Sequence, residues 1–138
     1  MFAHFYKDVF CFFLFFAFVF LTVSCAKEGE ERREAEYVVC ESWELPDELA
    51  QLIEEKKREE FQLVYENSAY QYLAAGYGEQ TEKYVAAVKT LEETKDRIYA
   101  DFILVSSLNL GDRAAGESSL CPYIVLRLEK NGKTVLFQ

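Results

Sequence analysis

The hydrophobic residues of this chain are divided very unevenly, and this division limits what the chain can fold into. Nine of the 12 Phe residues lie within residues 1–20. Of the 39 charged residues (15 Lys and Arg, 24 Asp and Glu), only Lys7 and Asp8 precede residue 27. A chain of 138 residues has room for one domain. The sequence therefore predicts an apolar leader followed by a single acidic domain.

The leader has the length of a signal peptide. Residues 9–23 are apolar at every position except Thr22. Fifteen residues of helix span about 22 Å, which is less than the ~30 Å hydrocarbon core of a bilayer. A short apolar block near the N-terminus, followed by small residues, is typical of a secretory signal. We therefore assign residues 1–25 to a signal peptide.

The end of this block resembles a bacterial lipobox, in which a cysteine after a small residue is lipidated and becomes the new N-terminus. Here the sequence is Leu21-Thr22-Val23-Ser24-Cys25. Two acyl chains suffice for stable anchoring. We predict a lipoprotein with Cys25 as the lipidation site, exported and anchored to the outer face of the bacterial cytoplasmic membrane. An uncleaved anchor reaching Ala26 and a signal peptide cleaved without lipidation are the alternatives.

Residues 26–36 are rich in charge and lack large apolar side chains, so we expect a flexible tether. The soluble domain then comprises residues 37–138. The only histidine of the chain, His4, lies in the leader. Ser-His-Asp and Cys-His nucleophiles and most zinc sites need an imidazole, so these are excluded. A net charge of −9 argues against nucleic-acid binding. We expect no metal and no cofactor.

Residues 46–60 have the pattern of an amphipathic helix. Pro46 suits a first helical turn, and Asp47 and Glu48 complement the positive end of the helix dipole. The next segment, residues 61–74, has two aromatic-rich runs around Asn67, which predicts a hairpin. Asn131-Gly132, between residues 123–130 and 133–137, is an even stronger hairpin signal.

The segment 80–96 is ambiguous. Its apolar residues Tyr84, Val85, Val88 and Leu91 follow helical spacing, although a partial alternation is also present. Residues 97–106 are strongly β-prone, and residues 107–120 form a long segment without a sustained period. The predicted class is α+β, with one N-terminal amphipathic helix before a mostly antiparallel β-sheet.

Two cysteines remain in the soluble domain. Cys40 and Cys121 are an even pair in an exported protein, which suggests a disulfide. Isolated cysteines in β-prone runs are also commonly small buried apolar residues. Both interpretations stay open at this point.

The order of segments from residue 45 to residue 137 resembles the PrcB-like family of exported bacterial proteins, whose members are components of protease complexes. The matching pieces are Leu45-Pro46-Asp47, the charged helix, residues 70–78, the loop 78–84, Pro122-Tyr123-Ile124-Val125 and Val135-Leu136-Phe137. The resemblance implies a strand at residues 84–91, against their helical spacing. It also implies a non-catalytic protein that stabilises or associates with a secreted protease.

The family's clearest motif is a turn of the form Gly-Glu-x-x-Thr-Gly-Gly-Tyr. Gly78, Glu79, Thr81 and Tyr84 match it when one position is closed up, whereas Glu82-Lys83 replaces the double glycine. A looser likeness to chagasin-type protease inhibitors, which also present a loop with Thr-Gly, is an alternative.

The expected function is protein binding at the cell surface, with the membrane as the second partner through the anchor. The contact region is expected at the loop around Gly76–Lys83 together with residues 107–120, because loops on a rigid scaffold commonly carry function. Tyr77, between Gly76 and Gly78, is the expected anchor residue. A small hydrolase using two carboxylates, and a purely structural role at the envelope, are the alternatives.

Overall fold

The computed structural model describes residues 31–138, within which Arg32–Gln138 form one unit. Cys25, the rest of the leader and residues 26–30 of the expected tether lie outside the described residues. Within the described part of the tether, Arg33 and Glu34 form a strand. Within residues 31–138, no helix has the length and apolar character needed to cross a membrane.

The described part of the chain is mostly strand, with a single α-helix. The elements in order are β1 (Arg33–Glu34), β2 (Val38–Val39), the short 3-10 helix η1 (Ser42–Glu44), α2 (Asp47–Lys56), β3 (Glu60–Glu66), β4 (Tyr70–Tyr77), β5 (Val85–Glu93), β6 (Arg97–Val105), the 3-10 helix η2 (Ser107–Asn109), β7 (Tyr123–Glu129) and β8 (Thr134–Phe137).

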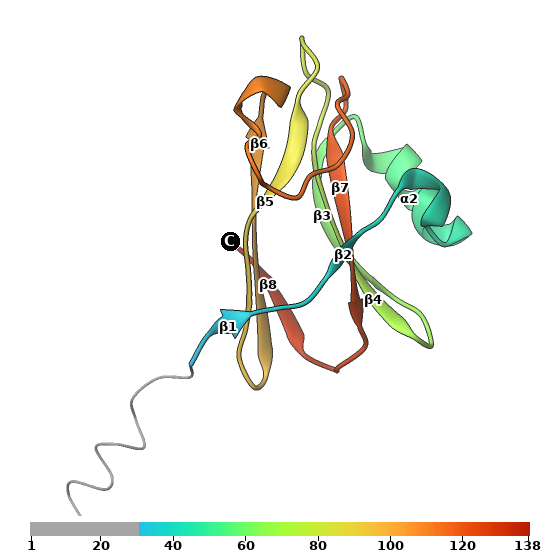
Figure 1. Cartoon of the computed structure of the whole chain (residues 1–138). Helices are drawn as coiled ribbons and strands as arrows, with labels where there is room; N and C mark the ends of the chain where they lie inside the picture. The colour runs from blue at the N-terminus through green and yellow to red at the C-terminus, as the bar shows by residue number, and fades with distance from the viewer. Residues whose placement is uncertain (1–30) are drawn as a thin grey trace, which may run out of the picture. The chain divides into compact units, whose positions relative to one another are not determined.

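These strands form two four-stranded sheets that face each other (Figure 1). Sheet 1 has the order β1-β5-β6-β8, and sheet 2 has the order β2-β7-β4-β3. Every pairing is antiparallel except β6 with β8. The α+β class and the mostly antiparallel pairing are therefore confirmed. The expectation of one sheet is wrong, because the chain passes from one sheet to the other after β1, β4, β6 and β7.

Side chains alternate between two apolar layers, and β4 shows this most clearly. Leu73 and Ala75 point into the core between the two sheets, whereas Tyr72 and Ala74 point toward α2. Because both faces of β4 are covered, almost all of its residues are buried. The domain thus has three layers: sheet 1, sheet 2 and the helix.

The helix α2 is shorter than residues 46–60, and this expectation is corrected at its C-terminal end. Leu49 and Ile53 are buried against sheet 2, as their spacing predicts. The N–H of Lys57 donates to the carbonyl of Ile53 at 2.8 Å and ends the helix. Glu60 is already paired with Tyr77 of β4. The helix therefore ends before residues 57–60, because Glu60 already belongs to β3.

The strand expected at residues 84–91 is confirmed, because β5 covers Val85–Glu93 and pairs with β6. Ala86 and Val88 face the core between the sheets, and so does Leu91. The register shifts between Val88 and Thr90, as in a β-bulge. The extra residue turns a spacing of two into a spacing of three, which explains the helix-like pattern in the sequence.

The two expected hairpins have opposite outcomes. Residues 61–74 do form a hairpin, in which the Asn67 side-chain oxygen accepts from the N–H groups of Ala69 and Tyr70 at 2.9 and 2.8 Å. The hairpin at Asn131-Gly132 is wrong. Gly132 has φ 70°, but β7 belongs to sheet 2 and β8 to sheet 1. The inward packing of Val135 and Phe137 beside β6 holds β8 in the opposite sheet.

Candidate functional site

The strand ends place the expected contact loops at one end of the sandwich. β4 ends there, β5 and β7 begin there, and β6 leads into η2 (Figure 1). We call the connections 78–84 and 106–122 together the loop end. The opposite end carries the turns between β3 and β4 and between β5 and β6, together with the crossing from β7 to β8.

The two loops named from the sequence are joined by hydrogen bonds. The N–H of Gln80 donates to the carbonyl of Leu120 at 2.7 Å. Tyr84 and Ser119 exchange two backbone hydrogen bonds of 3.0 Å each. The structure therefore brings the two segments together into one surface, and it places Tyr84 at their junction.

Residues 114–119 behave as an additional strand along β5. The N–H of Val88 donates to the carbonyl of Ala114 at 2.8 Å, and the N–H of Gly116 donates to the carbonyl of Ala86 at 2.9 Å. A side chain at Gly116 would lie 2.3 Å from the carbonyl oxygen of Tyr123, so this position requires glycine. Residues 107–120, which have no sustained period in the sequence, thus include a segment that is hydrogen-bonded to β5 and packed against Tyr123 of β7.

The two glycines of the expected contact loop have packing roles. Gly76 lies under the Phe61 ring, where a Cβ atom would come within 2.2 Å of a ring carbon. Gly78 has φ 74°, a conformation that L side chains rarely adopt. Both glycines are buried, so neither is accessible to a binding partner.

Tyr77 is the last residue of β4 and packs against the core between the sheets. Its side chain is half-buried, and this burial is the main reason why the pKa of the phenol is raised, with Asp101 and Glu60 adding to the effect. Glu79 and Thr81 are exposed beyond it. Of the residues of the expected motif, these two are the ones open to solvent.

Gln80 was missed by the sequence analysis. Its side-chain amide donates to the carbonyl of Tyr77 at 2.8 Å and fixes the turn that follows β4. Side-chain amides commonly bond to nearby backbone groups in turns, but the sequence gives no sign of which residue of such a run will do so.

Large apolar side chains that face solvent were also missed. Leu108 in η2 is 95% exposed, and Leu120 is 47% exposed, both on the loop end. Trp43, the only tryptophan of the chain, is 82% exposed in η1. The sequence feature that could have indicated these exposed side chains is an apolar residue between two polar residues, as in Ser107-Leu108-Asn109.

Cys40 and Cys121 are free thiols in the structure, so the disulfide considered above is not formed there. The N–H of Cys40 donates to the carbonyl of Val125, four residues beyond Cys121. Burial is the main cause of a raised pKa for the Cys40 thiol.

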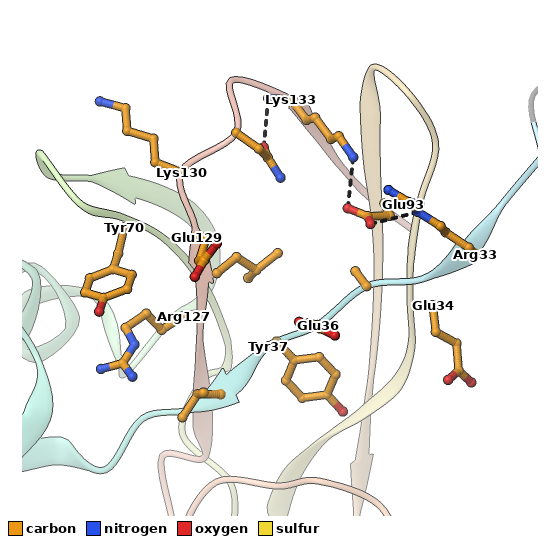
Figure 2. Close-up of a pocket in the computed structure, with 14 residues that line it drawn as sticks. Arg33, Glu34, Glu36, Tyr37, Tyr70, Glu93, Arg127, Glu129, Lys130 and Lys133 are labelled. Atoms are coloured by element: carbon orange, nitrogen blue, oxygen red, sulfur yellow. Dashed lines mark hydrogen bonds and ion pairs between the residues drawn. The ribbon is translucent and has the colours of Figure 1, made fainter.

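A charged groove lies at the opposite end of the sandwich (Figure 2). It is open, has a volume of about 1090 Å³, and runs between the N-terminal strands and the end of β7. Four cationic and four anionic side chains line it: Arg33, Arg127, Lys130 and Lys133, and Glu34, Glu36, Glu93 and Glu129. The balance of charge gives this groove no preference for an anionic or a cationic ligand.

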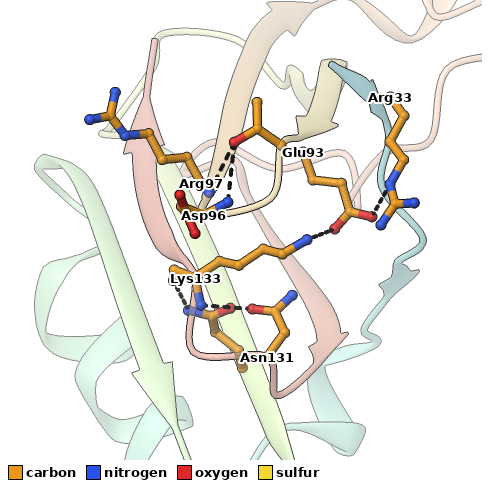
Figure 3. A network of polar contacts seen from close by, with 8 residues as sticks. Arg33, Glu93, Asp96, Arg97, Asn131 and Lys133 are labelled. Carbon is orange, nitrogen blue, oxygen red and sulfur yellow. Dashed lines mark hydrogen bonds and ion pairs between the residues drawn. The ribbon is translucent and has the colours of Figure 1, made fainter. Parts of the chain in front are cut away.

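The central carboxylate of the groove is Glu93, and it is paired with two cations (Figure 3). Its oxygens lie 2.9 Å from the Lys133 ammonium and 3.0 Å from Arg33 Nε. The hydrogen bond from Lys133 is the main reason why the pKa of Glu93 is lowered, and the charge of Arg33 adds to it. This cluster connects β1, β5 and the residue before β8, so we interpret it as a clamp between segments.

Other cations of the groove also have contacts within it. The Arg127 guanidinium lies 4.6 Å from the centre of the Tyr70 ring. The Lys130 ammonium donates to the carbonyl of Asn67 at 3.3 Å. Within residues 31–138, no group of three or more His, Cys, Asp or Glu side chains could hold a metal ion.

No family model, curated protein or solved structure matches the chain. The PrcB-like assignment therefore stays a prediction from the order of segments.

Proposed function

We propose that the unit Arg32–Gln138 is a non-catalytic protein-binding domain, and that a lipid on Cys25 holds it at the outer face of the cytoplasmic membrane. Its partner would be a secreted protease, as the resemblance to the PrcB-like family implies. Binding would take place at the loop end.

The observation that carries this proposal is the exposure of Leu108 and Leu120 at the loop end, where Leu120 itself takes part in the hydrogen bonds that join the two loops. A leucine with nearly all of its surface in water gains ~1.5–3 kcal/mol when a partner covers it fully. Leu120 adds a second apolar side chain on the same pair of loops. A fixed backbone lowers the entropy that binding has to overcome.

The charges at the other end of the sandwich favour binding over catalysis. Glu93, the least solvent-exposed carboxylate of the ion pairs in residues 31–138, is engaged by two cations. A carboxylate held ionised in this way is a poor general acid, since a general acid needs a pKa near the working pH. The groove therefore supports a structural role for its charges.

The test is capture of partners from the native membranes by the tagged full chain. Leu108→Ser and Leu120→Ser should each weaken capture of the same partner. Val64→Ser is the matched control, because Val64 is 42% exposed but lies on β3, away from the loops. Captured proteins are then assayed for peptidase activity.

Equal capture by all three variants would contradict the loop end as the binding surface. Capture of one reproducible partner without peptidase activity would contradict the protease as the partner.

A further inference from the structure

Two strands at the sheet edges are long enough to accept another strand. These are β8 in sheet 1 and β3 in sheet 2; the other two edges are formed by the two-residue strands β1 and β2. An edge strand presents a row of unpaired backbone N–H and C=O groups, which is a template for pairing with another chain.

The direction of the free groups on β8 follows from its pairing with β6. The N–H of Thr134 donates to the carbonyl of Asp96 at 3.1 Å, and the N–H of Gln138 donates to the carbonyl of Ala100 at 2.8 Å. Backbone groups of alternate residues point to opposite sides of a strand, so the backbone of Leu136 also faces β6. The N–H and C=O groups of Val135 and Phe137 therefore point outward.

We propose that β8 pairs in antiparallel fashion with β8 of a second copy of this chain, with the two-fold axis at Leu136. Val135 then exchanges two hydrogen bonds with Phe137 of the second copy, and Phe137 exchanges two with Val135 of the second copy. Leu136 lies opposite its own counterpart. The result is a continuous sheet of eight strands, made of two copies of sheet 1.

The charged residues on β8 and β3 indicate which of these two edge strands can pair with its own copy. β8 consists of Thr134, Val135, Leu136 and Phe137, so self-pairing brings no charges together. A symmetric antiparallel pairing over the whole length of β3, centred on Leu63, would place Glu60 opposite Glu66 of the second copy, and like charges directly opposite each other are destabilising. Among the two edges, β8 is the one that is complementary to itself.

The side chains of β8 favour the same partner. Leu136 is 38% exposed and is the register partner of Tyr99 on β6. In the dimer, the two Leu136 side chains cover each other and continue the row that Tyr99 begins. A contact of four residues on each side is small, so the dimer is reversible. Confinement of anchored chains to a membrane surface would raise their effective concentration and favour it.

Disulfide trapping in membranes tests this pairing. Opposite residues in a non-hydrogen-bonded antiparallel pair have Cα atoms about 4.5 Å apart, within the range that a disulfide spans. Leu136→Cys is made in the full chain with Cys11, Cys40 and Cys121 replaced by Ala, and Cys25 kept for the anchor. Val64→Cys in the same background is the control, since it lies on the other free edge with similar exposure.

Mild oxidation should convert Leu136→Cys mainly to a covalent dimer and leave Val64→Cys mainly monomeric. Equal amounts of covalent dimer from both variants, or none from Leu136→Cys, would overturn the proposal.

A second pair of variants checks the same contact without cysteines. Leu136→Lys places two positive charges opposite each other on the two-fold axis, and it should raise the dimer dissociation constant about tenfold or more in sedimentation equilibrium. Val64→Lys adds the same charge on β3 and should leave the dissociation constant unchanged. A monomeric wild-type chain at every concentration, or equal weakening by both substitutions, would overturn the proposal.

Discussion

Tyr77 was expected to be an exposed binding residue because it lies between two glycines in the sequence, but the structure places it elsewhere. Between two glycines, an aromatic side chain looks like the tip of a loop. In the structure both glycines are buried, and the ring packs against the core between the sheets. Gly76 gives space to Phe61, and Gly78 provides the positive φ that ends β4. The glycines thus serve the packing around Tyr77 rather than its exposure.

Tyr77→Ala should lower the free energy of unfolding by about 1–3 kcal/mol, because it removes half-buried apolar surface and leaves space in the core. Urea denaturation measures this change. Thr81→Ala, at an exposed position of the same loop, should change stability by no more than about 0.5 kcal/mol. Loss of partner capture by Tyr77→Ala at unchanged stability would instead identify Tyr77 as a binding residue.

At the scale of elements, the sequence predicted most strands and failed where sheet membership decides the outcome. Local chemistry fixes the hairpin at Asn67, because the asparagine side chain bonds to the next backbone groups. The same kind of bond occurs at Asn131, whose side-chain oxygen accepts from the N–H of Lys133 at 3.0 Å. A turn signal specifies a change of direction, whereas burial of Val135 and Phe137 determines the sheet that the strand joins.

The candidate site, like the strands, was predicted only in part from the sequence. The two contact loops were named from their irregular sequence, but their hydrogen bonds to each other depend on the pairing of β4, β5 and β7. Leu108 and Leu120 were missed because their exposure is a property of the folded surface, which a single apolar residue in a loop does not reveal.

The clamp around Glu93 should make the attachment of β1 depend on pH. Because the pKa of Glu93 is lower in the folded state, its contribution to stability is present above the ordinary value of 4.5 and is lost as pH falls through the folded value. Glu93→Gln lacks this contribution, so the wild type should be more stable at neutral pH and the difference should shrink in acid.

Thermal unfolding of the wild type and of Glu93→Gln, from neutral pH to below the ordinary pKa of 4.5, measures this difference in stability. Glu59→Gln is the control, since Glu59 is exposed and takes part in none of the ion pairs within residues 31–138. A difference between wild type and Glu93→Gln that stays constant down to acid pH would contradict the clamp.

At the scale of the whole molecule, attachment to the membrane should depend on one atom, the sulfur of Cys25. Cys25→Ala should move the protein from the membrane fraction to the soluble fraction, because the proposed acyl chains, which would supply the anchoring energy, cannot then be attached. Fractionation and the mass of the mature N-terminus measure this. Cys11→Ala, within the leader, should leave the distribution unchanged. A Cys25→Ala protein that stays in the membrane, or a wild type without an acyl mass, would contradict lipidation.

The position of β8 in sheet 1 also affects how the domain acquires its fold. Sheet 1 combines β1, near the start of the described chain, with β8, about a hundred residues later, while β5 and β6 between them form a local hairpin. Contacts between residues so far apart close slowly, because the loop entropy must be overcome before they form. During synthesis, β5 and β6 can pair as soon as they emerge, but the edge beside β6 stays open until β8 follows. Of the described strands, the one that is made last is therefore the one that completes sheet 1.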